Sequence, residues 1–149
     1  MNIEPIGVVK SPATEAVDKD WGKVTAEIHI DNRWSPGLAG LDQFSHIIVV
    51  FYMHQSTFTP TSDLVRRPQG REDMPMLGIF AQRARHRPNP IGITAVPIVK
   101  LEGNVITVKG LDAVNGTPVL DVKPYFPDYD RIESPKVPEW VTKLMVGYF

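Results

Sequence analysis

The stretch Phe44-Ser-His-Ile-Ile-Val-Val-Phe-Tyr-Met-His54 decides the fold class of this 149-residue chain. β-Branched and aromatic residues dominate it, which is typical of a strand. Its apolar residues fall on both faces, so the pattern predicts a strand covered on both sides, in the centre of a sheet or in a barrel wall. His46 is expected to be a core histidine. His54, where the strand meets a loop, is the better candidate for a functional site.

Other stretches have the composition of short strands separated by turns. In Gly22–Ile30, apolar and polar residues alternate, which indicates a half-buried strand. Pro97 predicts an edge or a bulge, and Asn115-Gly116 is the strongest hairpin signal. The remaining predicted strands are Ile3–Val9, Met76–Ala81, Ile91–Leu101, Val105–Leu111 and Thr117–Tyr125.

Helix signals are few. Ser35-Pro36 predicts the start of a short helical turn, and Glu139–Met145 predicts another. Ser56–Pro75 is expected to be a long loop. Together these patterns predict a mainly β fold, a single-domain β-barrel over residues 1–149 with a core of about residues 3–126 and a proline-rich tail, residues 127–149. The apolar end of the tail is expected to pack on its own domain or on a second subunit.

Composition restricts the possible functions. The chain has no cysteine, which excludes disulfides and thiolate–metal sites and is compatible with a cytoplasmic location. We expect no signal peptide and no metal, and Ile47–Met53, the longest apolar run, is too short to cross a membrane. Because the net charge is −1, any nucleic-acid surface must be a local patch.

One such patch is visible in the sequence. Six of the eight arginines lie between Arg66 and Arg87, where only Glu72 and Asp73 oppose them. The last three stand in Arg83-Ala-Arg-His-Arg-Pro-Asn-Pro-Ile-Gly92, which we call the arginine corner. Its prolines stiffen the turn, and arginine binds carboxylate or phosphate in two-point fashion. The pattern predicts an anion or nucleotide site, with solvated surface as the alternative.

The sequence lacks the common catalytic motifs. It has no Gly-x-Gly-x-x-Gly after a strand, no Walker-type loop, no His-Glu-x-x-His and no Gly-x-Ser-x-Gly. Composition and spacing therefore predict a soluble β domain with an arginine-lined anion site, and they name no reaction.

Three further groups of residues share a pattern with a known family. They are Phe44-Ser45-His46 with His54-Gln55, Gly78–Arg83 with Arg87–Gly92, and Leu111-Asp112 with Asn115–Pro118, Asp121 and Lys123-Pro124-Tyr125. With these groups the chain resembles, from Ile6 to Tyr125, the TsaA/TrmO family of tRNA methyltransferases. The resemblance implies a β-barrel enzyme that uses S-adenosylmethionine and forms a homodimer with the cofactor near the interface. It also implies methylation of N6 of threonylcarbamoyl-adenosine beside the anticodon of tRNA.

The resemblance also implies which residues form the site. Because methyl transfer to nitrogen releases a proton, Asp121 is in addition a candidate general base, with a structural ion pair to Lys123 or another basic group as the alternative. The expected contacts to RNA or to the threonyl carboxylate are Arg85, His86, Arg87 and Asn89, of which Asn89 could be only a turn residue. The expected cofactor-binding residues are His54, Gln55, Arg83, Ile93, Leu111, Asp112, Asn115, Gly116 and Thr117.

Two features differ from the family pattern. Asp18-Lys19-Asp20-Trp21 stands where family members carry a Pro-Arg-Gln segment that contacts the cofactor. The better-known bacterial members also have a further C-terminal domain, which a partner could supply here. The alternatives are a methyltransferase acting on a small molecule, a non-catalytic sensor of S-adenosylmethionine and an RNA-binding module.

Overall fold

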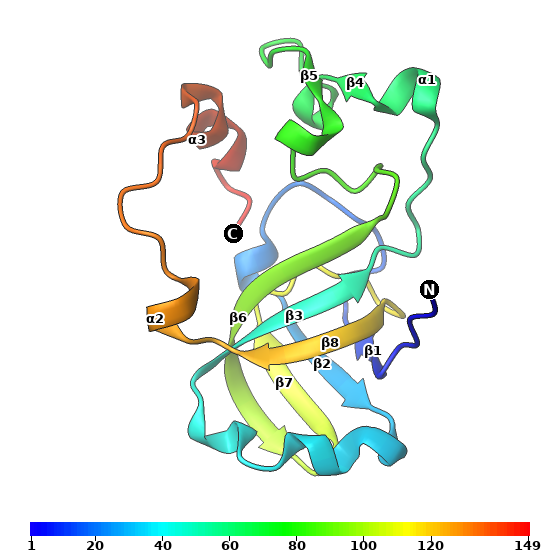
Figure 1. Cartoon of the computed structure of the whole chain (residues 1–149), viewed down its shortest axis with the longest axis vertical. Helices are drawn as coiled ribbons and strands as arrows, with labels where there is room; N and C mark the ends of the chain where they lie inside the picture. Colours follow the sequence, from blue (N-terminus) through cyan, green and yellow to red (C-terminus); the bar gives the residue numbers. More distant parts are fainter.

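The computed structural model describes residues 1–149 and confirms the predicted mainly β barrel. Six antiparallel strands close the barrel in the order β1-β2-β7-β6-β3-β8 (Figure 1). No helix has the length and apolar character needed to span a bilayer. The barrel strands are β1 (Gly7–Lys10), β2 (Thr25–Ile30), β3 (His46–Tyr52), β6 (Ile91–Glu102), β7 (Val105–Lys109) and β8 (Pro118–Pro124).

The inward side chains of the strands fill the barrel. Ala26, Ile28 and Ile30 of β2 are buried, as the alternation in the sequence predicts. Gly92 of β6 lies against the ring of Phe51, where an added Cβ would come within 2.4 Å of the ring. Only glycine therefore lets the end of the arginine corner cross this part of the core.

Strand β6 is long because it serves two neighbours. Ile91–Pro97 pair with β3, and Ile98–Glu102 pair with β7. The pairing with β7 is irregular between Ile98 and Lys100, next to the proline for which an edge or bulge was expected. The irregularity thus falls where the pairing of β6 changes from β3 to β7.

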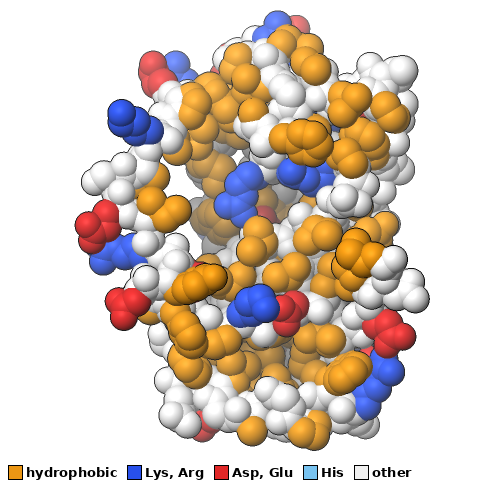
Figure 2. Space-filling model, in the orientation of Figure 1, with side chains coloured by type: hydrophobic (Ala, Val, Ile, Leu, Met, Phe, Trp, Pro, Cys, Tyr) orange, Lys and Arg blue, Asp and Glu red, His pale blue; other side chains and the backbone are white.

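The prediction that β3 is covered on both faces is wrong. Ile48 and Val50 are only half-buried and Tyr52 is exposed, because no other part of the chain covers the outer face of β3 and β6. Figure 2 shows apolar side chains gathered on this side of the molecule. His46 is also exposed and lies 2.7 Å from the Ser45 hydroxyl, so it is not a core histidine.

Residues 56–82 form a small lobe above the barrel, which we call the upper lobe (Figure 1). The predicted loop Ser56–Pro75 instead contains secondary structure, and the predicted strand Met76–Ala81 is interrupted after two residues. Strands β4 and β5 pair with each other, apart from the barrel. The elements are α1 (Pro60–Asp63), β4 (Val65–Arg66), the 3₁₀ turn Pro68–Gly70, β5 (Leu77–Gly78) and the 3₁₀ turn Ile79–Ala81.

Short helices flank the barrel. The 3₁₀ helix Asn32–Leu38 begins before the predicted Ser35 cap, and with the turn Leu41–Gln43 it crosses the end of the barrel opposite the upper lobe (Figure 1). Helix α2 (Pro127–Asp130) and helix α3 follow β8, and α3 spans Glu139–Met145 as predicted. The chain after α3 returns to the barrel beside the 3₁₀ turn Trp21–Lys23.

Candidate functional site

The arginine corner joins the upper lobe to β6. Gln82, 6% exposed, fixes the start of the corner, because its amide donates to the carbonyls of Arg66 at 2.8 Å and Leu77 at 2.9 Å. Its own backbone carbonyl accepts from the Arg87 guanidinium at 3.1 Å. The buried Oε1 of Gln82 has no partner. The start of the corner is thus fixed on the lobe, while its other end is part of β6.

None of the three corner arginines pairs with a carboxylate. Arg83 donates to the Ile93 carbonyl at 2.7 Å, and Arg87 donates to backbone carbonyls. Arg85 donates to the imidazole of His86 at 3.0 Å and to the Ala16 carbonyl at 3.4 Å. These contacts orient the guanidinium groups and leave their charge uncompensated. Such a set of oriented cations can bind carboxylate or phosphate.

His86 connects the corner to the chain that follows β3. Its Nδ1 lies 2.7 Å from the Thr57 carbonyl and its Nε2 accepts from Arg85, an arrangement that fits a proton on Nδ1. The Ser56 hydroxyl donates to the Arg85 carbonyl at 2.5 Å. His86 therefore positions Arg85 as well as offering its own ring.

Asp112 lies three residues after the end of β7 and contacts β6 at Thr94, near the point where the corner enters that strand. Its Oδ1 accepts from the Thr94 hydroxyl at 2.5 Å, and its Oδ2 accepts from the Tyr148 hydroxyl at 2.6 Å. Thr94 follows Ile93, whose carbonyl binds Arg83. Neighbouring residues of one strand thus hold the guanidinium of Arg83 and the carboxylate of Asp112.

Tyr148 lies within the electrostatic field of this site. Burial raises the pKa of its hydroxyl well above the ordinary 10.0, and the charge of Asp112 and the hydrogen bond to it raise the pKa further. The negative charge of Asp18 acts in the same direction, whereas the positive charge of Arg83 opposes it. Asp18 and Arg83 are therefore close enough to Tyr148 to affect the ionisation of its hydroxyl.

His54 and Gln55 lie at the end of β3 and face the loop after β1. The imidazole Nε2 of His54 would be 3.9 Å from a Cβ at Gly116, whose φ of +82° favours glycine. Gln55 donates to the Thr14 carbonyl at 3.3 Å, two residues before the carbonyl that binds Arg85. The loop after β1 thus contacts both Gln55 and the arginine corner, and His54 lies beside Gly116.

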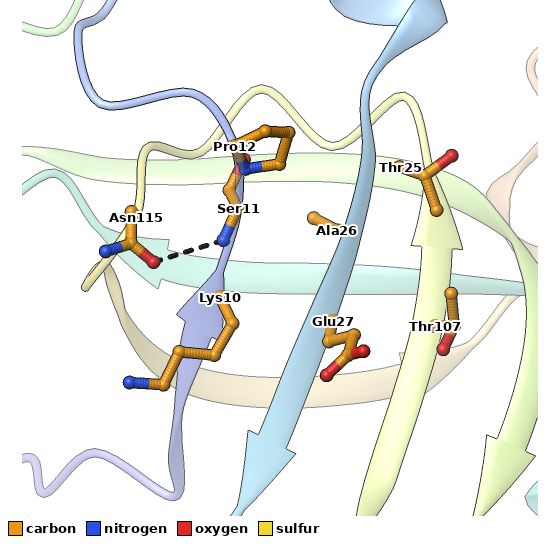
Figure 3. A pocket seen from close by; sticks show the side chains of 8 residues that line it. All are labelled: Lys10, Ser11, Pro12, Thr25, Ala26, Glu27, Thr107 and Asn115. Carbon is orange, nitrogen blue, oxygen red and sulfur yellow. Dashed lines mark hydrogen bonds between the residues drawn. The ribbon is translucent and has the colours of Figure 1, made fainter.

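Several predicted site residues point elsewhere. The side chains of Leu111 and Thr117 are buried, at 0% and 1% exposure, so only their backbone could face a ligand. Asn115 accepts from the Ser11 amide at 3.2 Å. It lines a shallow polar groove on the outer surface of β1, β2 and β7 (Figure 3). The structure does not bring its side chain together with Asp112.

The other predicted residues are exposed or separately paired. Ile93 is 51% exposed on the outer face of β6, and Asn89 is exposed in the turn. Asp121 of β8 pairs with Lys123 at 2.6 Å and accepts from the Val122 amide, so the ion pair expected as the alternative to a catalytic function is present. No hydrogen bond or ion pair joins Asp121 to Asp112 or the corner.

Sequence reasoning missed Thr94 and Tyr148. Thr94 appeared only as one residue of a strand. Tyr148 appeared only as part of an apolar end, although a packed tyrosine usually finds a partner for its hydroxyl. That requirement was the one signal that could have indicated its contact with Asp112.

The site combines uncompensated cations with a single oriented carboxylate. No group of three or more His, Cys, Asp or Glu side chains has the arrangement of a metal site. The corner arginines together with Asp112 can bind a molecule that carries an anionic part and also a cationic or hydroxylated part. Fold and site define a β-barrel protein in which an arginine corner without carboxylate partners lies near an oriented carboxylate.

The chain belongs to the tRNA-methyltransferase O N-terminal domain family, whose pattern matches residues 13–131. A crystal structure of TrmO from Pseudomonas aeruginosa has the same fold, with a TM-score of 0.76 and 28% identity. The match covers 94% of this chain and 61% of that one. The chain therefore spans less than two-thirds of the length of this bacterial protein.

Relatives of similar sequence carry two kinds of name. A probable S-adenosyl-L-methionine-binding protein of Pyrococcus abyssi is 35% identical over 147 residues, which is 93% of this chain and 75% of that protein. The human tRNA (adenine(37)-N6)-methyltransferase is 39% identical over 105 residues, which is 70% of this chain and 23% of that protein.

Proposed function

We propose that this protein is an S-adenosylmethionine-dependent methyltransferase that methylates N6 of threonylcarbamoyl-adenosine beside the anticodon of tRNA. The observation that carries the proposal is that two neighbouring residues of β6 hold opposite charges: Ile93 accepts from Arg83, and Thr94 donates to Asp112. The chain that carries this arrangement belongs to the tRNA-methyltransferase O N-terminal domain family. The barrel, about residues 3–126, and the segment 127–149 would act as one domain, since Tyr148 bonds to Asp112.

The chemistry of the site fits this cofactor. S-adenosylmethionine carries a carboxylate, an ammonium, a sulfonium and ribose hydroxyls, so it has partners for both the arginines and Asp112. When bound, it supplies the methyl group and leaves as S-adenosylhomocysteine. Arg83 would hold the carboxylate and Asp112 the cationic or hydroxyl groups. The remaining residues proposed to line the cofactor are His54, Gln55, Ile93, Leu111, Asn115, Gly116 and Thr117.

Arg85, His86, Arg87 and Asn89 are proposed to contact tRNA. Arg85 and Arg87 have no carboxylate partner, which leaves them available for phosphate or for the threonyl carboxylate. Phosphate contacts of this kind position an RNA without reading its bases. Binding to tRNA would place the protein in the cytoplasm.

The chain's own part in the reaction is positioning. It would align the acceptor nitrogen with the methyl group and exclude water. The proton that leaves N6 goes to water or to a base, for which Asp121 is our candidate. An Asp121→Asn variant should then lower the rate of methyl transfer and keep the cofactor Kd. An unchanged rate would exclude Asp121 as the base.

A homodimer would cover the apolar face of β3 and β6. Tyr52, Ile93 and Val99 are 41%, 51% and 58% exposed there, and apolar patches of this kind mark interfaces. Ala95 is exposed at the centre of the face, opposite Ile48. Ala95→Glu should convert a dimer to a folded monomer in analytical ultracentrifugation. A monomer in the unmodified protein would refute the dimer.

The deciding experiment is calorimetric titration with S-adenosylmethionine. The unmodified chain should bind about one molecule, and Arg83→Ala should weaken binding roughly 10- to 100-fold, the loss expected for hydrogen bonds between charged groups. Arg131→Ala, which removes an arginine remote from the corner in sequence, is the control. No binding to folded protein would overturn the proposal.

A methyl-transfer assay then distinguishes an enzyme from a protein that only binds S-adenosylmethionine. The second alternative is also compatible with the names of the archaeal relatives, which mention binding and no reaction. With labelled S-adenosylmethionine, the enzyme should methylate tRNA that carries threonylcarbamoyl-adenosine and leave tRNA without it unlabelled. Binding without transfer to this tRNA would indicate a sensor or an enzyme with another acceptor.

A further inference from the structure

The segment after α3 is docked on the loop that precedes β2. The Gly147 carbonyl accepts from the Asp20 amide at 2.8 Å, and the Tyr148 carbonyl accepts from the Trp21 amide at 2.8 Å. Phe149 lies against Gly22, where an added Cβ would come within 2.6 Å of its backbone carbon. Figure 1 shows the end of the chain beside this blue turn, at the end of the barrel nearer the upper lobe.

This docking delivers one polar group to the candidate cofactor site, the Tyr148 hydroxyl. It donates to Oδ2 of Asp112 at 2.6 Å, while Thr94 donates to Oδ1 at 2.5 Å. Two hydroxyl donors from separate segments fix the plane of the carboxylate. Each oxygen of an ionised carboxylate has about two acceptor positions, so one position on each stays open to a ligand.

We propose that Tyr148 is a positioning residue of the cofactor site, which holds Asp112 in the orientation that receives the cationic or hydroxyl groups of S-adenosylmethionine. This inference rests on the function proposed above. Residues 139–149 are then part of the binding site, although the family match ends at residue 131.

The surroundings of Tyr148 favour a fixed donor over a proton acceptor. The charged groups that affect it are Asp112, Asp18 and Arg83, and burial is the largest cause of its raised pKa. A phenol whose pKa is raised keeps its proton throughout the physiological range. Tyr148 therefore donates to Asp112 at every pH at which the protein works, and it cannot serve as the base that takes the N6 proton.

The test removes only the hydroxyl. Tyr148→Phe in the full chain should weaken S-adenosylmethionine binding about tenfold, the loss expected for one hydrogen bond to a charged group. Thermal unfolding without ligand checks that the variant is folded at the temperature of the titration; it should unfold a few degrees below Tyr129→Phe, because it lacks the bond to Asp112. Tyr129 is the matched control because it is 87% exposed on α2.

A double-mutant cycle tests whether Tyr148 acts through Asp112. Asp112→Asn should weaken binding by itself, and Tyr148→Phe should then add little, because the carboxylate that the hydroxyl orients is gone. Additive losses would overturn the inference, and so would an unchanged Kd in Tyr148→Phe. In both cases the unmodified chain still binds, which leaves the proposed function intact. No binding by the unmodified chain would overturn both.

Discussion

The arginines of the upper lobe and those of the arginine corner are close in sequence but differ in their partners. Arg66 pairs with Asp63 at 3.4 Å, and Arg71 pairs with Asp73 at 2.6 Å. Arg83, Arg85 and Arg87 donate to carbonyls and an imidazole instead. Arg66 and Arg71 are therefore neutralised, whereas Arg67, which donates to the Met74 carbonyl, and the three corner arginines keep their charge. A count of arginines therefore overstates the candidate anion site, because two of the six already have carboxylate partners.

The largest effect on stability is expected for Gln82, which bonds to Arg66 in the upper lobe and to Arg87 in the arginine corner. Gln82→Ala removes two hydrogen bonds, to Arg66 and Leu77, from a side chain that is 6% exposed. The free energy of unfolding should fall by about 3 kcal/mol, from the lost bonds and the cavity. Urea unfolding followed by circular dichroism measures it, with the exposed Gln43→Ala as control. Equal losses in both variants would mean that the lobe does not depend on this contact.

The next effect concerns RNA. Arg85→Ala with Arg87→Ala should weaken tRNA binding about tenfold and reduce the slope of log K against log salt by roughly one to two. Arg66→Ala with Arg71→Ala should leave that slope unchanged, because these arginines already have carboxylate partners. Filter binding over a range of salt concentrations tests both pairs. A similar change of slope in the two double variants would remove the distinction between the groups.

The smallest effect on stability is expected for the ion pair between Arg71 and Asp73. The hydrogen bond from Arg71, and to a lesser extent its charge, lower the pKa of the Asp73 carboxyl below its ordinary 3.8. Because the folded pKa is the lower one, the pair stabilises the fold above the unfolded pKa, and this contribution is lost as pH falls through the folded pKa. An NMR titration should show the pKa of Asp73 rising toward 3.8 in Arg71→Ala.

In the same variant, thermal unfolding at pH 7 should change little, because the pair is exposed to solvent and screened. A marked fall in the unfolding temperature would show that the neutralised arginines stabilise the lobe more than their exposure suggests.

Local patterns predicted those parts of the fold whose cause is local. The alternation in β2 and the helical segment Glu139–Met145 were correct, since each depends on neighbours in sequence. The two faces of β3 look alike in sequence, and only one is covered. The difference depends on which elements of the chain pack against that strand, and no short pattern contains this information.

The candidate site was predictable only in part for the same reason. Arg83 could be selected as a candidate because the arginine corner is one continuous stretch. The partners of Asp112 come from β6 and from the end of the chain, with sequence separations of 18 and 36 residues. Asp112 could be selected by resemblance, but its two hydroxyl donors required the closed barrel and the docked segment.

The pairing that closes the barrel joins its first strand to its last, and this affects how the protein folds during synthesis. Gly7 of β1 pairs with Val119 of β8, so the barrel cannot close until β8 has been synthesised. Contacts of such long range make folding slow. A ribosome must deliver most of the chain before this step, and Tyr148 leaves it later still. The two hydroxyl donors of Asp112 would therefore come together only after every strand of the barrel has been synthesised.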